Sequence, residues 1–296
     1  MFTKESLYIN AVKYDTQLKL DYKKLNNEEI IEMNNSVYLV SNDLLPLEIA
    51  QKINSSQEEI ENSFISTLLI SDTTKLVPKN LSSKLTDCEI GKFNNEFDIA
   101  VLKTTLFETK NYFAKTGIDY IYSAFHIMNL HIEKKVCRNE LLIFLYNDKA
   151  FILILDKSGI IVFHETIDLP TFEIVKKTHF YEDDLEGQKL FDEIYYLELN
   201  EIIHNTLNDF YNKKSGIFVE KITILYVLKQ LTNEDVEQLA HDLMLKVDYN
   251  KINIDEEIFE LSKDKHLKKS FIKPRKKKKK RDFKNLYITI FILVLS

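Results

Sequence analysis

The densest group of charged side chains lies near the C-terminus, in the run KPRKKKKKR at positions 273–281. Side chains of this kind attract polyanions, and each one close to an anionic membrane contributes about 1 kcal/mol of binding. The sequence therefore predicts a membrane-proximal basic site that contacts anionic lipid headgroups. Its residues are Lys273, Arg275, Lys276, Lys277, Lys278, Lys279, Lys280 and Arg281.

An almost wholly apolar stretch, LYITIFILVL, follows the basic run from Leu286 to Leu295. A helix needs about 20 apolar residues to cross a bilayer, so this stretch is about half of a span. We therefore expect residues 285–296 to begin a truncated transmembrane helix. Because Lys and Arg gather on the cytoplasmic side of a span, the rest of the chain is expected to be cytoplasmic. The alternatives are an apolar end packed on the body and, for the basic run, a nuclear localisation signal.

The net charge of −6 conceals an acidic body and a basic tail. The segment from Lys263 to Lys284 contains thirteen Lys or Arg and two Asp, so it carries +11 and the remaining residues carry −17. A body of this charge repels phosphate, which argues against a nucleic-acid partner. The two cysteines, Cys88 and Cys137, form no CxxC pair, so neither a disulfide framework nor a zinc site is predicted.

Histidines and acidic residues elsewhere give no catalytic pattern. His126 and His131 would lie about 140° apart around a helix, so they are predicted to be ordinary surface or boundary residues rather than metal ligands. His164 is expected to be a satisfied histidine within a sheet, and Glu182 to Asp184 a solvated acidic loop. No P-loop, HExxH or Gly-x-Ser-x-Gly string occurs. The sequence therefore predicts no enzyme, no metal and no cofactor.

The second half of the chain shows a clear order of elements. Three runs rich in β-branched and aromatic residues are separated by the hairpin signals Asn147-Asp148 and Lys157-Ser158-Gly159. A long amphipathic helix, a strand, a helix capped by Thr232 and a last strand follow. The predicted strands are 141–146, 150–155, 160–167, 222–227 and 247–254, and the long helix is 191–211.

The first half shows a looser version of the same order, which predicts an α/β protein of duplicated architecture. Ser56 with Glu59 and Thr105 with Glu108 resemble capping boxes, and Gly117 is expected to end the helix after Thr105. The predicted strands are 7–12, 18–22, 37–41, 97–102 and 118–122, with helical regions at 44–69, 105–117 and 123–132. The predicted divisions are a first lobe 1–134, a second lobe 135–262, a basic juxtamembrane linker 263–284 and the membrane segment 285–296.

The stretch FDIAVLKTTLFETKNYFAKTGIDYIYSAFHIMNL, Phe97 to Leu130, resembles the actin-like cytoplasmic domains of bacterial inner-membrane platforms, the type II secretion L proteins and type IV pilus M proteins. The meander from Leu141 and the helix behind it resemble the same families. The resemblance covers most of Val37 to Ile254 as a pattern, with no diagnostic string. It implies an actin-like, ribonuclease H-like duplicated fold of two lobes, each with a mixed sheet flanked by helices. It also implies a single-pass protein of the bacterial inner membrane.

Nucleotide binding in that fold depends on glycine-containing turns whose backbone N–H groups approach phosphate closely. The resemblance places these turns at Ala11 to Asp15, at Tyr146 to Lys149 and, on the adenosine side, at Leu228 to Leu231. None of the three contains glycine, and the whole chain has five. The nucleotide-binding turns are therefore expected to be degenerate.

The leading functional expectation is a non-catalytic scaffold of a type II secretion, type IV pilus or DNA-uptake platform. Its expected partners are an assembly or secretion ATPase, other inner-membrane platform proteins, an anionic membrane surface and a second copy of the chain. Two alternatives stay open: an actin-like ATP-binding protein, and the cytoplasmic input domain of a bitopic signalling protein.

Overall fold

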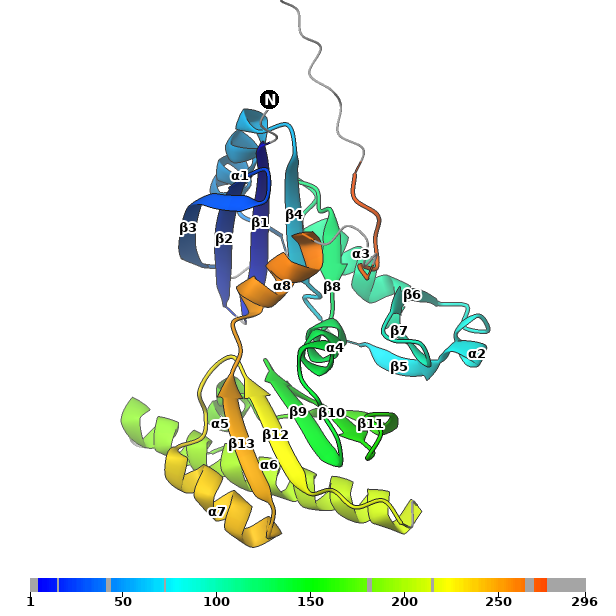
Figure 1. Cartoon of the computed structure of the whole chain (residues 1–296). Helices are drawn as coiled ribbons and strands as arrows, with labels where there is room; N and C mark the ends of the chain where they lie inside the picture. Colours follow the sequence, from blue (N-terminus) through cyan, green and yellow to red (C-terminus); the bar gives the residue numbers. More distant parts are fainter. Residues whose placement is uncertain are drawn as a thin grey trace, which may run out of the picture.

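The structure is a computed structural model and describes residues 5–14, 16–40, 44–71, 73–179, 183–213, 216–263 and 269–275. Two five-stranded sheets that share the same strand topology form its centre (Figure 1). The first sheet runs β3-β2-β1-β4-β8, with the first three strands antiparallel and β1, β4 and β8 parallel. Its strands are β1 (Glu5–Tyr14), β2 (Gln17–Asn26), β3 (Glu29–Leu39), β4 (Ser63–Leu68) and β8 (Tyr120–Tyr122).

The second sheet repeats this pattern as β11-β10-β9-β12-β13. Its first three strands form the antiparallel meander, and β9, β12 and β13 are parallel. Its strands are β9 (Glu140–Tyr146), β10 (Lys149–Leu155), β11 (Ile161–Asp168), β12 (Lys221–Tyr226) and β13 (Lys246–Lys251). Two mixed sheets of identical order, each flanked by helices, make this a duplicated actin-like α/β fold, as the sequence predicts.

Several predicted elements are confirmed with longer bounds. Asn147 takes the left-handed conformation, with φ of 52°, in the two-residue turn between β9 and β10. Thr232 caps α7 (Asn233–Leu243) through a capping box with Asp235. The long helix is α6 (Asp184–Lys213), and Asp183 of the acidic loop accepts hydrogen bonds from the backbone of Leu185 and Glu186 in its first turn.

The helical region predicted at 44–69 is wrong in its second half. α1 (Leu47–Glu59) ends before a wholly buried strand, β4. Ser56 begins no helix, because its hydroxyl donates to the carbonyl of Lys52 inside α1. Thr105 likewise caps nothing: α3 (Lys103–Tyr112) has Leu102 at its N-cap, and the Thr105 hydroxyl bonds that of Thr73.

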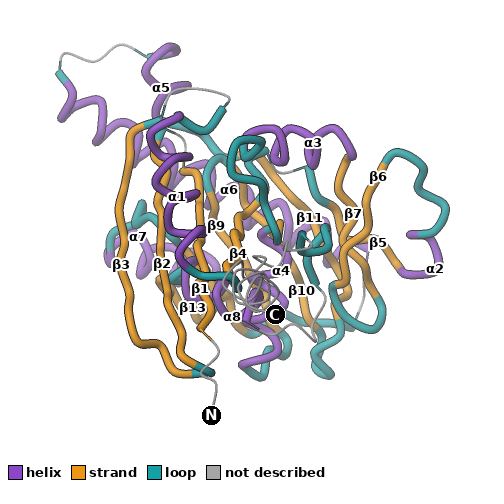
Figure 2. The backbone as a smooth tube through the Cα atoms, turned by 90° about the horizontal axis from the view of Figure 1, so that it is seen from above, coloured by secondary structure: helices purple, strands orange, loops and turns teal. Residues whose placement is uncertain are grey.

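A third, three-stranded sheet was absent from the predicted layout. It has the order β5-β7-β6 and lies on the side of the first lobe opposite β3 (Figure 2). The predicted strand 97–102 belongs here, as β7, and not to the main sheet. Its elements are β5 (Lys75–Pro78), α2 (Lys79–Ser82), β6 (Cys88–Lys92) and β7 (Phe97–Leu102).

Two helices lie between the lobes, each following the last strand of one sheet: α4 (Ala124–Lys134) and α8 (Ile254–Lys263). α8 contacts β1, β4 and α4, so the chain returns to the first lobe after completing the second sheet. Asn10 on β1 donates to the carbonyl of Asp255 in α8 at 2.8 Å, and Lys19 pairs with the Asp255 carboxylate. The predicted division at 262 places α8 in the second lobe, whereas α8 packs on the sheet of the first lobe.

The central strands β9, β10 and β12 of the second sheet are buried on both faces. Alternate residues of β9 and β10 pack on α6, and α5 (Phe172–Thr178) and α7 (Asn233–Leu243) lie on the same side. The other residues of β9 and β10 join a hydrophobic core that continues through α4 into the first lobe. Because one core spans both lobes, the space between the two sheets is filled largely by apolar side chains.

Candidate functional site

The two hairpin turns that carry phosphate-binding loops in actin-like ATPases meet through tyrosines here. Tyr14 ends β1 and Tyr146 ends β9, so each stands at the mouth of its hairpin. Their rings pack edge to face with centroids 5.9 Å apart. Burial raises the pKa of Tyr14 well above its ordinary value, which keeps its hydroxyl neutral. The mouth of the first hairpin is thus covered by an aromatic pair.

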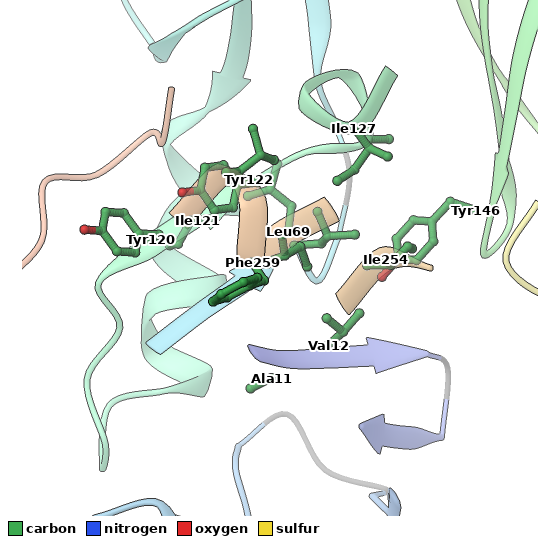
Figure 3. Packing of buried hydrophobic residues seen from close by; sticks show 14 of the residues in the cluster. Ala11, Val12, Leu69, Tyr120, Ile121, Tyr122, Ile127, Tyr146, Ile254 and Phe259 are labelled. Carbon is green, nitrogen blue, oxygen red and sulfur yellow. The ribbon is translucent and has the colours of Figure 1, made fainter. Parts of the chain in front are cut away.

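Tyr146 also fixes one lobe to the other. Its hydroxyl donates to the backbone carbonyl of Lys13 at 3.1 Å, and its ring stacks on Phe144. Figure 3 shows Tyr146 pointing from the second lobe toward Val12 of β1 and Ile254 of α8. The side chain therefore joins the hydrophobic core that also contains Val12 and Ile254 of the first lobe and α8.

Tyr146→Phe is expected to lower the free energy of unfolding by about 1 kcal/mol, the usual net value of one neutral hydrogen bond. The ring packing stays, so only the bond to the Lys13 carbonyl is lost. Urea denaturation of both proteins measures the difference. Tyr211→Phe, which removes a hydroxyl bonded to the Val219 amide inside the second lobe, is the matched control for a bond within one lobe. An unchanged stability in Tyr146→Phe would refute the bond between the lobes.

The third turn, which the resemblance places on the adenosine side, follows β12 and is contacted by another tyrosine. The hydroxyl of Tyr249 on β13 accepts hydrogen bonds from the backbone N–H groups of Gln230 and Leu231, both at 3.3 Å. The Tyr249 ring stacks on Tyr226 with centroids 4.0 Å apart. Two of the amides that face this turn are therefore used within the protein.

Residues 269–275, here named the C-terminal strap, form a second set of polar contacts. The strap runs along β8, the edge strand of the first sheet. The Phe271 amide donates to the Ile121 carbonyl at 3.1 Å, and the Ser270 hydroxyl accepts from the Ile121 amide at 3.0 Å. The Phe271 ring packs over Gly91 of the small sheet, where a Cβ would come within 2.8 Å of the ring. The strap therefore covers an edge and joins two sheets.

Arg275 is the main electrostatic anchor of the strap. Its guanidinium donates through Nε and one terminal nitrogen to the two oxygens of Asp119, at 3.0 and 2.9 Å, and its amide donates to the same carboxylate. Its other terminal nitrogen donates to the Thr116 carbonyl at 2.6 Å. Asp119 is fully buried and also accepts from the Ile65 amide. Gly117 stands beside this pair with φ of 70°, and any Cβ there would collide with the guanidinium.

His126 fastens the other end of the strap to α4. The Ser123 amide donates to Nδ1 at 3.0 Å, so the proton of the neutral ring is on Nε2, which donates to the Lys269 carbonyl at 2.6 Å. Lys269 in turn places its ammonium on both oxygens of Glu133 at 2.8 Å. Burial lowers the pKa of His126 to about 3, so the ring is neutral near pH 7.

The prediction that His126 is a surface or boundary residue is therefore wrong. It is fully buried, while His131 at the far end of the same helix is partly exposed. The capping position of Ser123 explains the difference, because it turns the third residue of the helix back toward its start. His164 packs edge to face on Phe97, as a histidine within a sheet.

The predicted basic site is divided by the structure. Arg275 belongs to the fold through Asp119, whereas Lys273 is exposed and lines an open groove of about 530 Å³ beside α3. Lys276 to Arg281 and the apolar stretch 286–295 lie outside the described residues. Among the residues that are described, no helix is long and apolar enough to cross a membrane. The same residues hold no cluster of side chains suited to a metal ion.

Two family models match separate parts of the chain. Residues 3–129 match a family model described as a domain of unknown function (DUF8569), and residues 171–266 match another, also a domain of unknown function (DUF8341). Among curated proteins, no significant match is found.

Similar solved structures are distant in sequence. A protein with actin-like ATPase fold and unknown function from Bacteroides thetaiotaomicron is 12% identical, with 86% of this chain and 95% of that one covered and a TM-score of 0.45. A ROK family protein from Streptococcus pneumoniae, in complex with sucrose, is 9% identical over 86% and 95%, with a TM-score of 0.41. A Ppx/GppA family member from Aquifex aeolicus is 10% identical over 76% and 66%, with a TM-score of 0.36.

Proposed function

We propose that this chain is a non-catalytic, actin-like scaffold of a bacterial inner-membrane platform, which holds a cytoplasmic assembly ATPase close to the membrane. The observation that carries the proposal is the aromatic closure between the hairpins, where Tyr146 of the second lobe packs on Tyr14 and bonds the Lys13 carbonyl. A nucleotide clamp needs backbone amides free to approach phosphate, and at the third turn the amides of Gln230 and Leu231 donate to the Tyr249 hydroxyl instead. A fold of this kind with its clamp closed retains surfaces for contacts with other proteins.

The position of the tail supports attachment to a membrane. The strap ends at Arg275 on the first lobe, so the basic run that follows starts from a fixed point of the protein surface. A polybasic segment beside an apolar stretch binds anionic lipid, with about 1 kcal/mol from each charge near the surface. In the proposed arrangement the first lobe lies nearest to the membrane and the second lobe reaches farther into the cytoplasm.

Affinity purification of the full chain from detergent-solubilised membranes of its own cells tests the scaffold. We expect a P-loop ATPase of the assembly class to be retained at about 50 mM salt and lost at about 500 mM, since an acidic body binds a basic surface through screened charges. Mass spectrometry identifies the retained proteins. If no such ATPase is enriched at low salt over a mock purification, the scaffold proposal is wrong.

The second candidate, an ATP-binding protein, is favoured by the fold class and is tested separately. Isothermal titration of the purified chain with Mg-ATP is expected to give no saturable heat. A dissociation constant below about 100 μM would show that the tyrosine-closed turns open, and would overturn the non-catalytic reading. Nucleotide is therefore the probe that separates the two candidates.

A further inference from the structure

The four edges of the two main sheets are protected to very different degrees. β8 is covered by the C-terminal strap, and β11 lies against β5 of the small sheet. β13 carries Lys246, Asp248 and Lys251 along its short length. β3 ends its sheet, and within the described part of the chain no element lies against its outer side (Figures 1 and 2). Proteins normally guard such edges with charge, proline or a cover, because a bare edge pairs with other strands.

β3 is unguarded over most of its length. Its only charged residues, Glu29 and Glu32, lie in its first half, next to a bulge opposite Lys24 and Leu25 of β2. The seven residues from Met33 to Leu39 contain no charge and no proline. This part of the strand is therefore a neutral edge with no bulge in its pairing to β2.

Apolar side chains on one face of β3 are strongly exposed. Met33, Val37 and Leu39 are 64%, 56% and 81% exposed. Alternation along the strand places them on one face, with Asn35 between Met33 and Val37. In the sheet they lie beside Lys23, Lys19 and Gln17 of β2. Lys19 contacts Asp255 of α8, so α8 covers this face of the sheet but does not extend over β3. Exposed apolar residues beside open backbone groups form a surface built for pairing.

We propose that β3 pairs antiparallel with β3 of a second copy of this chain, about a two-fold axis at Asn35, to give a dimer with a continuous ten-stranded sheet. In this register Met33 lies opposite Val37 of the other copy, and Leu39 lies opposite the bulge at Ile31. Each apolar pair occurs twice by symmetry. Asn35 lies opposite its own counterpart, where the two amides can bond each other.

Charge favours this arrangement over the parallel one. Both glutamates occupy the first half of β3, so antiparallel pairing sets Glu32 opposite Tyr38 and keeps it apart from its counterpart. Parallel pairing in register would set each glutamate opposite itself, which is unfavourable. The charges of β3 are therefore compatible with antiparallel pairing of two copies and not with parallel pairing. This inference goes beyond the scaffold proposal, because it concerns contact between identical copies and holds whether or not an ATPase binds.

A single cysteine at the proposed axis tests the register. Asn35→Cys is made in a Cys88→Ser background of the full chain, where the remaining native thiol, Cys137, is buried, and is oxidised mildly in detergent. Residues directly opposite on antiparallel strands have Cα atoms about 4.5–5.5 Å apart, within the range of a disulfide. We expect most of the chain to run as a covalent dimer on non-reducing gels. Glu165→Cys, an exposed residue on the β11 edge, is the matched control and should stay largely monomeric.

The association itself is measured by light scattering of the full chain in detergent over a range of concentrations. Val37→Lys should raise the dimer dissociation constant at least about tenfold, because each copy then sets a charge opposite Met33. Ile90→Lys replaces an exposed apolar residue on β6 and should leave it unchanged. A monomer at all concentrations, or a dimer that neither cross-links at position 35 nor weakens with Val37→Lys, overturns the proposal.

Discussion

Replacing Arg275 by methionine is expected to lower the free energy of unfolding by about 3 kcal/mol, the lower end of the cost of breaking a buried ion pair. Asp119 is fully buried, and the substitution removes the two side-chain donors that face its carboxylate. Methionine retains the apolar bulk but leaves that charge without its cation. Arg275 is itself partly exposed, so the loss comes chiefly from the stranded carboxylate and not from an unfilled volume.

Urea denaturation followed by circular dichroism measures this loss. Lys273→Met, two positions earlier, removes the same charge from an exposed side chain and should change stability by less than about 0.5 kcal/mol. Hydrogen exchange gives a local readout, because the Phe271 amide, bonded to the Ile121 carbonyl, should lose protection in Arg275→Met. Equal stability of the two variants would mean that the strap does not hold the first lobe.

Lowering the pH is expected to reduce the free energy of unfolding through protonation of His126. Burial lowers the pKa of this ring to about 3 in the folded state, against about 6.5 when unfolded. The unfolded state therefore binds the proton first, so the contribution is complete above pH 6.5 and is lost as the pH falls toward 3. The slope is about 1.4 kcal/mol per pH unit within that window. Protonation would also place a hydrogen on Nδ1, against the Ser123 amide that donates to it.

The comparison of His126→Gln with the parent at pH 7 and pH 5 isolates this effect. The parent should lose about 2 kcal/mol between the two from this group, whereas the variant, less stable at pH 7, should lose correspondingly less. His131, whose pKa burial lowers to about 4, contributes in the same direction in both proteins, and the difference between them cancels it. Identical pH dependence would show that His126 is not the titrating group.

The duplicated architecture was predictable because the local signals in the second half of the chain agree with the fold. Asn147-Asp148 is a typical two-residue hairpin turn, and it joins the adjacent strands β9 and β10. The spacing of Thr232 and Asp235 in the sequence is that of a capping box, and the pair caps α7. β4 was missed because SFISTL follows a helical pattern directly and is buried on both faces, so it shows no alternation. Its strand character becomes visible only beside β1 and β8.

The functional features were harder to predict, since they join residues far apart in the chain. Arg275 and Asp119 are 156 positions apart, and nothing local distinguishes Arg275 from the lysines that follow it. The absence of glycine from the three predicted turns was visible in the sequence, but the contacts that the tyrosines make there were not. Tyr14, Tyr146 and Tyr249 look like ordinary strand residues until the two lobes are assembled.

The return of α8 and the strap to the first lobe sets the order in which a newly made chain can mature. Residues 140–251 of the second sheet form one continuous stretch, whereas the first lobe needs Asp255, bonded to Asn10 across 245 positions, and Arg275. Contacts of such sequence separation form late, because a long loop must close first. During synthesis on the ribosome, we therefore expect the first lobe to remain incompletely folded, and to need chaperones, until α8 and the strap emerge.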